Sequence, residues 1–265
     1  MRTELVSEPG DPSRPNEDFA GVALPASGQG GAVVVLDGVT PPRNGTGCVH
    51  SVPWFTARLG GALTELTVSL PDVPLADALS VALARTADAH RDTCDLSHPR
   101  TPQATVVLAR WSPVAVEYLI LSDSALLVES PDGTVTPLLD DRLARLPRSA
   151  LATDAMVDAD LRNKEGGFFT AAADPAVARR AVTGTLPRSR VRALAALTDG
   201  ATRWVEKFGA GDWAGLMGVV RKEGGRALVD RVRALELADT DRSFLGRSKT
   251  HDDATVVLVE FPPAA

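Results

Sequence analysis

The sequence has few cysteines and lysines and no long uninterrupted run of apolar residues. Its 265 residues include only two cysteines, Cys48 and Cys94, which excludes a disulfide-stabilised scaffold and favours a reducing, cytoplasmic location. No apolar run approaches the roughly 18 residues of a membrane span, and the first residues lack the apolar stretch of a signal peptide. We therefore expect no membrane partner.

The charge balance and the composition exclude further classes of protein. The net charge of −6 argues against a broad basic face, so we expect no nucleic-acid partner. Hydrophobic residues make up 44% and charged residues 23%, which is typical of globular proteins rather than disordered chains or coiled coils. Lysine is scarce beside abundant arginine and alanine, which suggests a GC-rich bacterial genome. A single domain over residues 1–265 is expected.

The order of predicted elements favours an α+β fold. Helical spacing of apolar residues predicts helices over 50–70, over the segment after Pro74, and within 200–238. Short apolar or alternating runs predict strands at 19–24, 32–36, 104–111, 114–121, 125–129, 191–198 and 254–261. Strands and helices do not alternate regularly, which disfavours a Rossmann sheet or a TIM barrel. Two mainly antiparallel sheets with helices packed outside fit this order better.

Acidic residues stand where the first two predicted strands begin and end. Glu17 and Asp18 immediately precede the first strand, and Asp37 immediately follows the second. If these strands form an antiparallel hairpin, the start of one lies beside the end of the other. The three carboxylates then converge at one edge of the sheet.

Other acids occupy similar positions later in the chain. Asp123 and Asp199 each follow a predicted strand, and Asp252 and Asp253 precede the last one. Carboxylates gathered at one edge repel each other and are costly to desolvate, and a hard cation such as Mg²⁺ or Mn²⁺ removes both penalties. Taken singly, an Asp-Gly pair such as Asp37-Gly38 or Asp199-Gly200 is more often an ordinary turn.

Six short motifs, in order, resemble those of the metal-dependent protein phosphatase family (PPM, also called protein phosphatase 2C). They are the Asn16-Glu17-Asp18 triplet, VVVLDG (33–38), QATVVLA (103–109), LSDSALLV (121–128), ALTDGA (196–201) and DDATVVLV (252–259). The resemblance runs over nearly the whole chain. It implies a four-layer α/β/β/α sandwich with metal ions at one end.

The resemblance also implies roles for individual residues. Asp37 would bridge two Mn²⁺ or Mg²⁺ ions, with Glu17 and the Gly38 carbonyl on the second ion. Asp199 and Asp252 would hold the first ion, and Asp123 a weaker third one. Asp18 and Asp253 would not contact the ions directly. Asp18 would accept a hydrogen bond from metal-bound water. Arg14 stands near the position of the family's phosphate-binding arginine.

The implied activity is hydrolysis of phosphoserine and phosphothreonine in proteins by direct attack of a metal-bridging hydroxide. Phosphoproteins would be the substrates, and a serine/threonine kinase the partner in bacterial signalling. Two departures keep alternatives open. Val39-Thr40-Pro41-Pro42 replaces the family's His-Gly-Gly or Met-Gly-Gly, and Asp253 replaces an asparagine. A pseudophosphatase or binding module of the same fold, or a hydrolase of small phosphate monoesters, are the alternatives.

The histidines and cysteines are assigned no chemistry at this stage. Cys48 and His50 resemble a soft-metal pair, but zinc needs three or four ligands and no partner motif is evident, so packing is expected. By the resemblance, a histidine directly after Gly38 would act as general acid for the leaving group, and none is present there. His50 and His251 are candidates for this role, but we expect His50 to pack at the start of a helix and His251 to be an ordinary loop residue. His90 lies on the apolar phase of the second helix and is expected to be structural.

Overall fold

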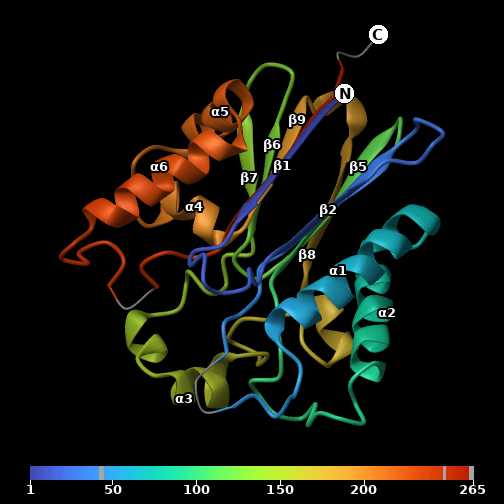
Figure 1. Ribbon diagram of the computed structural model, residues 1–265. Coiled ribbons are helices and arrows are strands. Elements are labelled where there is room, and N and C mark those ends of the chain that lie inside the picture. The colour runs from blue at the N-terminus through green and yellow to red at the C-terminus, as the bar shows by residue number, and fades with distance from the viewer. Residues whose placement is uncertain (42–44, 247–248, 263–265) are drawn as a thin grey trace.

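The structure is a computed structural model that describes residues 1–41, 45–246 and 249–262. Within these residues ten strands form two five-stranded antiparallel sheets (Figure 1). The first sheet has, in spatial order, β1 (Arg2–Glu8), β10 (Ala254–Glu260), β9 (Ala193–Leu197), β6 (Ala125–Glu129) and β7 (Val135–Leu138). The second has β2 (Phe19–Ala23), β3 (Gly31–Leu36), β4 (Val106–Trp111), β5 (Ala115–Leu121) and β8 (Val182–Pro187).

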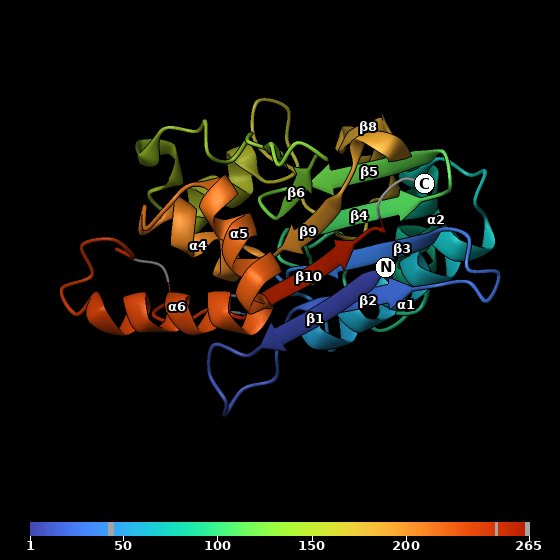
Figure 2. The same cartoon turned by 90° about the horizontal axis from the view of Figure 1, so that it is seen from above.

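Helices cover the outer face of each sheet, which gives four layers. The pair α1 (Val52–Ser69) and α2 (Leu75–Asp88) packs on the second sheet, whereas α4 (Asp199–Glu206), α5 (Trp213–Glu223) and α6 (Gly225–Ala238) pack on the first. A third apolar cluster fills the space between the sheets. Figure 2 shows the two sheets stacked with their strands inclined to each other. The predicted fold class is confirmed.

Short helical turns lie in the segment between β7 and β8. They comprise Arg148–Leu151, α3 (Asp154–Met156), Val157–Leu161 and Pro175–Arg180, and a further turn, Arg188–Arg190, follows β8. No helix in the described part of the chain has the length and apolar character needed to cross a membrane.

The strand register brings the acidic motifs to one end of the sandwich. The hairpin expected between residues 19–24 and 32–36 is present, with Phe19 opposite Leu36. In the other sheet Leu197 lies between Ala125 and Val256. The residues just before β2, β6 and β10 therefore lie at the same end as those just after β3 and β9.

Three strands, β1, β7 and β8, were not predicted from the sequence. All three are edge strands, and their burial patterns show residues that are exposed or only half-buried. An edge strand needs few apolar residues because only one neighbour and part of one face are covered. The segments RTELVSE and VTGTLP therefore lack the apolar run that marks the buried strands.

Candidate active site

Asp37 and Asp199 form the centre of the acidic end. Asp37 directly follows β3, and its backbone N–H donates to the Thr105 hydroxyl at 3.2 Å. Asp199 begins α4 directly after β9, and its backbone N–H donates to Oδ2 of Asp37 at 3.3 Å. The Asp37 carboxylate thus lies at the first turn of α4. The structure joins the two Asp-Gly motifs that the sequence places 162 residues apart.

Asp18 is held by two hydroxyl groups from the opposite sheet. Its Oδ2 accepts from Thr198 at 3.0 Å and from Thr255 at 2.7 Å. Its Oδ1 is buried and has no hydrogen-bond partner among the described residues. A buried carboxylate oxygen without a donor is costly. This oxygen is free to accept from a group that enters the site.

Two glycines let the acidic segments approach backbone to backbone. A Cβ on Gly38 would meet the Glu17 carbonyl, and a Cβ on Gly200 would meet the carbonyl of Asp253. Asp253 also holds the Glu17 segment directly, because its Oδ2 accepts from the Glu17 N–H at 2.6 Å and its Oδ1 from the Gly10 N–H at 2.8 Å. Its carboxylate therefore positions the chain before β2.

Two basic side chains contact Asp252, and one of them also lies near Glu17. Oδ2 of Asp252 accepts from Arg203 at 2.9 Å, and its Oδ1 accepts from the Lys249 ammonium at 2.6 Å. The same ammonium lies 3.7 Å from Oε2 of Glu17, which also accepts from the Thr40 hydroxyl. Lys249 therefore supplies positive charge between two carboxylates that the resemblance assigns to different metal ions.

Asp123 lies beside this group, at the tight turn between β5 and β6. It follows Ser122, whose backbone has a φ of 71° and whose hydroxyl donates to Oδ1 of Asp123 at 3.1 Å. Asp123 lines a cavity of about 410 Å³ together with Asp140, Glu206 and Lys207 among others. Asp123 therefore lies at the side of the acidic group rather than at its centre.

Arg14 lies in an exposed turn. Its backbone N–H donates to the Asp11 carbonyl at 3.0 Å, and the side chain is exposed. A role in phosphate binding stays a prediction.

Burial and mutual repulsion raise the pKa values of the central acids. Burial is the larger cause for Asp37, whose pKa lies well above the ordinary value, and Asp199, Asp18 and Asp252 add repulsion. Burial, followed by Asp252 and Asp123, raises the pKa of Asp199 to about 7. Burial also raises the pKa of Asp18 to about 8, against the two threonine hydroxyls that lower it. These carboxylates cannot all ionise near neutral pH without added positive charge.

The donor set fits hard divalent cations. The converging side chains offer oxygen atoms alone, which Mg²⁺ and Mn²⁺ prefer, and the orphaned Asp18 oxygen can accept from water on such an ion. Glu17, Asp37, Asp199 and Asp252 could supply carboxylate ligands, with Asp123 at the side. The charge repulsion within the group is the penalty that such cations would remove.

The two histidine candidates for the general acid are engaged elsewhere. His251 Nδ1 lies 2.7 Å from Oε2 of Glu236, which also pairs with Arg233. His50 stacks on Trp54 with ring centroids 4.0 Å apart and belongs to a separate group with Cys48, His90 and Cys94. The expectation that Cys48 and His50 have no partner residues is wrong, because the fold brings His90 and Cys94 to them. The two cysteines form a disulfide, where the sequence led us to expect unpaired thiols.

Sequence reasoning missed the residues that hold the acids in place. Arg203, Lys249 and Thr40 contact carboxylates of the site, and Thr198 and Thr255 fix Asp18. Thr198 and Thr255 lie inside the quoted motifs ALTDGA and DDATVVLV, each within two residues of an acid, so their position was a usable signal. Arg203 carried a weaker one, since it lies one helical turn after Asp199.

The whole chain is similar in fold to solved serine/threonine phosphatases. No protein-family profile matches the sequence, and no curated protein is found to be similar to it. A bacterial serine phosphatase aligns with a TM-score of 0.62 and 12% identity, covering 100% of this chain and 99% of that one. Stp1 from Staphylococcus aureus aligns with a TM-score of 0.59 and 13% identity, covering 99% of this chain and 95% of that one. The PPM Ser-Thr phosphatase MsPP from Mycobacterium smegmatis, in complex with cacodylate, aligns with a TM-score of 0.57 and 16% identity, covering 99% of each chain. The chain therefore has the fold of PPM-type phosphatases.

Proposed function

We propose that this chain is a metal-dependent protein serine/threonine phosphatase that uses Mn²⁺ or Mg²⁺. The observation that carries the proposal is the meeting of Asp37, Asp199 and Asp18 at one end of the sandwich, with raised pKa values and a buried unpartnered oxygen. A protein has no structural reason to bury mutually repelling acids there, whereas a pair of cations gives one.

The oxygen-rich group would hold two ions. Asp37 would contact both, Glu17 and the Gly38 carbonyl would hold one, and Asp199 and Asp252 the other. A weaker third ion would lie near Asp123. When bound, the ions would activate water near neutral pH and neutralise charge on the phosphoryl oxygens.

The protein's own groups then position the reactants. Asp18, fixed through Oδ2 by two threonines, offers Oδ1 to accept a proton from the attacking water. Asp253 holds the backbone of Glu17 and so sets the distance between the two ligand groups. Arg203 orients the Asp252 carboxylate through a hydrogen bond of 2.9 Å. Lys249 must leave its place between Glu17 and Asp252 as the cations enter.

Phosphoproteins are the proposed substrates, with a serine/threonine kinase acting in the opposite direction in bacterial signalling. The support is that the structural neighbours are serine or serine/threonine phosphatases. A hydrolase of small phosphate monoesters has no separate observation in its favour, and a substrate panel would separate the two.

A second candidate is a pseudophosphatase that keeps the fold without turnover. It is favoured by one feature of the site: Glu17 accepts from Thr40, and Asp252 pairs with Arg203 and Lys249, so protein donors already occupy two of the carboxylates. Calorimetric titration with Mn²⁺ together with phosphate release distinguishes the two candidates, because a scaffold binds without releasing phosphate.

The direct test is hydrolysis of p-nitrophenyl phosphate with Mn²⁺, with Mg²⁺ and with a chelator. We expect turnover that depends on the metal and is lost in Asp252→Asn, and subsequent release of phosphate from phosphothreonine peptides. Asp160→Asn, which changes an acid outside the site, is the matched control and should retain activity. Turnover that persists in excess chelator would contradict the proposal.

A further inference from the structure

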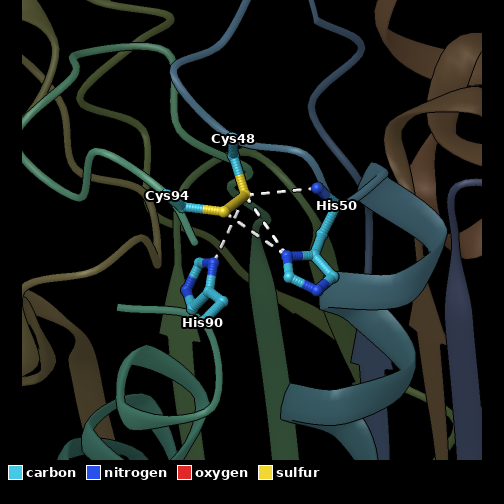
Figure 3. A group of neighbouring side chains, drawn as sticks. All are labelled: Cys48, His50, His90 and Cys94. Carbon is cyan, nitrogen blue, oxygen red and sulfur yellow. Dashed lines mark hydrogen bonds between the residues drawn. A yellow bond between two sulfur atoms is a disulfide. The ribbon is translucent and has the colours of Figure 1, made fainter. Parts of the chain in front are cut away.

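A second group of metal-ligating side chains lies on the helical layer, outside the acidic end. Cys48 and His50 precede α1, and His90 and Cys94 follow α2, so the group joins the start of one helix to the end of the other (Figure 3). One candidate ligand atom from each residue lies within 4.8 Å of all the others. His90 is buried, and the other three residues are half-buried.

The distances between sulfur and nitrogen match a tetrahedral zinc site. With Zn–S near 2.3 Å and Zn–N near 2.0–2.1 Å, two ligands at a tetrahedral angle lie about 3.5 Å apart. Nδ1 of His90 lies 3.4 Å from Sγ of Cys48, and Nδ1 of His50 lies 3.4 Å from Sγ of Cys94 and 3.7 Å from Sγ of Cys48. Both imidazole rings thus direct the same ring nitrogen at the sulfur atoms.

The surroundings of the group are also typical of zinc–thiolate sites. The His50 backbone N–H donates to Sγ of Cys48 at 3.4 Å, as outer hydrogen bonds to metal-bound thiolates do. Trp54 lies against both rings, at 4.0 Å from His50 and 5.3 Å from His90 between centroids. Two thiolates and two neutral imidazoles balance the charge of Zn²⁺, so a partly apolar environment is no obstacle.

The two arms of the group are connected independently of the sulfur atoms. The Asp95 N–H donates to the Gly47 carbonyl at 2.7 Å, and Gly47 has a φ of 69° that favours glycine. This contact places Cys48 and Cys94 side by side through the backbone. The disulfide between them uses the two sulfurs, yet it gives no reason for two histidines to converge on the same point.

We propose that Cys48, His50, His90 and Cys94 form a structural Cys₂His₂ site for Zn²⁺ when the two cysteines are reduced. Binding releases the thiol protons and involves no electron transfer. The disulfide is the zinc-free, oxidised form of the same group. The proposal does not depend on phosphatase activity, and its test measures metal content.

The test uses the full-length chain purified with a phosphine reductant and analysed for metals by mass spectrometry. Asp37→Asn combined with Asp252→Asn serves as the background, so that the oxygen site contributes no metal. We expect about one zinc ion per chain, and X-ray absorption at the zinc edge should show two sulfur atoms near 2.3 Å and two nitrogen atoms near 2.0–2.1 Å.

Variants separate the zinc site from a simple disulfide. His50→Ala with His90→Ala retains both cysteines and should lower zinc binding by more than about tenfold, because loss of even an outer hydrogen-bond partner of a ligand weakens metal binding about 10–100-fold. His98→Ala, in the same loop region but outside the group, is the control and should retain zinc. If the double variant fails to fold, cobalt substitution of the parent protein provides the readout, through a thiolate-to-cobalt charge-transfer band. A reduced parent protein that lacks zinc, or a site that shows only oxygen and nitrogen ligands, overturns the proposal.

Discussion

The acidic end and the Cys/His group differ in the type of side chain they contain and in how far apart these side chains lie in the sequence. The acidic end collects carboxylates from five distant segments, and burial forces them to repel each other. The Cys/His group brings together two local pairs, Cys48 with His50 and His90 with Cys94. In their neutral forms these side chains do not repel each other electrostatically. The first arrangement reduces the stability of the metal-free protein, as catalytic sites often do, and the second is suited to holding the fold together.

The largest effect is expected at the acidic end. Asp37→Asn should lower metal-dependent phosphatase activity by at least about 10³-fold, or about 4 kcal/mol in the barrier, because one carboxylate serves both ions. In chelator the same variant should melt a few degrees higher than the parent, since asparagine removes the free-energy cost of protonating this buried carboxyl group on folding. Activity assays and thermal melts measure the two effects, and wild-type turnover would contradict the assignment of Asp37.

The Cys/His group should respond in the opposite direction. Cys48→Ser combined with Cys94→Ser should destabilise the protein by about 3 kcal/mol in urea unfolding, because both the disulfide and a zinc bridge connect segments 46 residues apart. The activity per folded molecule should stay within about twofold at saturating Mn²⁺, since the group contributes no ligand to the acidic end. A stable but inactive variant would mean that the loop between Gly38 and Cys48 couples the two groups.

The pH dependence of stability should reveal the buried acids. The pKa of Asp18 is raised to about 8 and that of Asp199 to about 7, both from an ordinary value of 3.8. The native state therefore keeps protons that the unfolded chain has released, so the metal-free protein loses stability as the pH rises from about 4 to about 8. Thermal melts in chelator over this range measure the slope.

The matched variant is Asp18→Asn, which should flatten the upper part of this profile. Saturating Mn²⁺ should reverse the trend in the parent protein, because cations bind the ionised carboxylates. A metal-free protein whose stability rises between pH 5 and pH 8 would show that the acids are ionised and compensated in some other way.

The smallest effect is expected at Lys249. Its ammonium lies 2.6 Å from Asp252 and 3.7 Å from Glu17, so it competes with metal ions for both carboxylates. Lys249→Met should strengthen Mn²⁺ binding several-fold by calorimetry, the scale of a partly exposed ion pair. Lys222→Met, on α5, is the control and should leave the affinity unchanged. Weaker binding in Lys249→Met would instead assign Lys249 a supporting role in the site.

The sequence predicts much of the fold because the buried strands carry clear apolar runs. The segments around Val33–Leu36 and Val256–Val259 are buried on both faces, and their ends are marked by acids. The hairpin of β2 and β3 follows from these runs and is confirmed by the register. The edge strands β1, β7 and β8 gave no such signal.

The site is less predictable, because contacts between distant segments are not encoded in local spacing. Arg203 and Lys249 pair with Asp252, yet the only sequence signal for Arg203 is its spacing of one helical turn after Asp199. Lys249 has no pattern that distinguishes it from a surface cation. His90 and Cys94 look unrelated to Cys48 and His50 until the two helices pack side by side. Of the loop that departs from the family pattern, residues 42–44 lie outside the described residues, so its effect on substrate binding stays a prediction.

The glycines at the acidic end have a consequence for how the site tolerates change. Gly10, Gly38 and Gly200 each press one acid-bearing segment directly against the main chain of another, with no side chain between them. The spacing of the carboxylates is therefore fixed by van der Waals contact between main-chain segments rather than by the adjustable shape of the core. Substitutions that loosen the apolar layers should lower the melting temperature long before they alter which ion the pocket prefers.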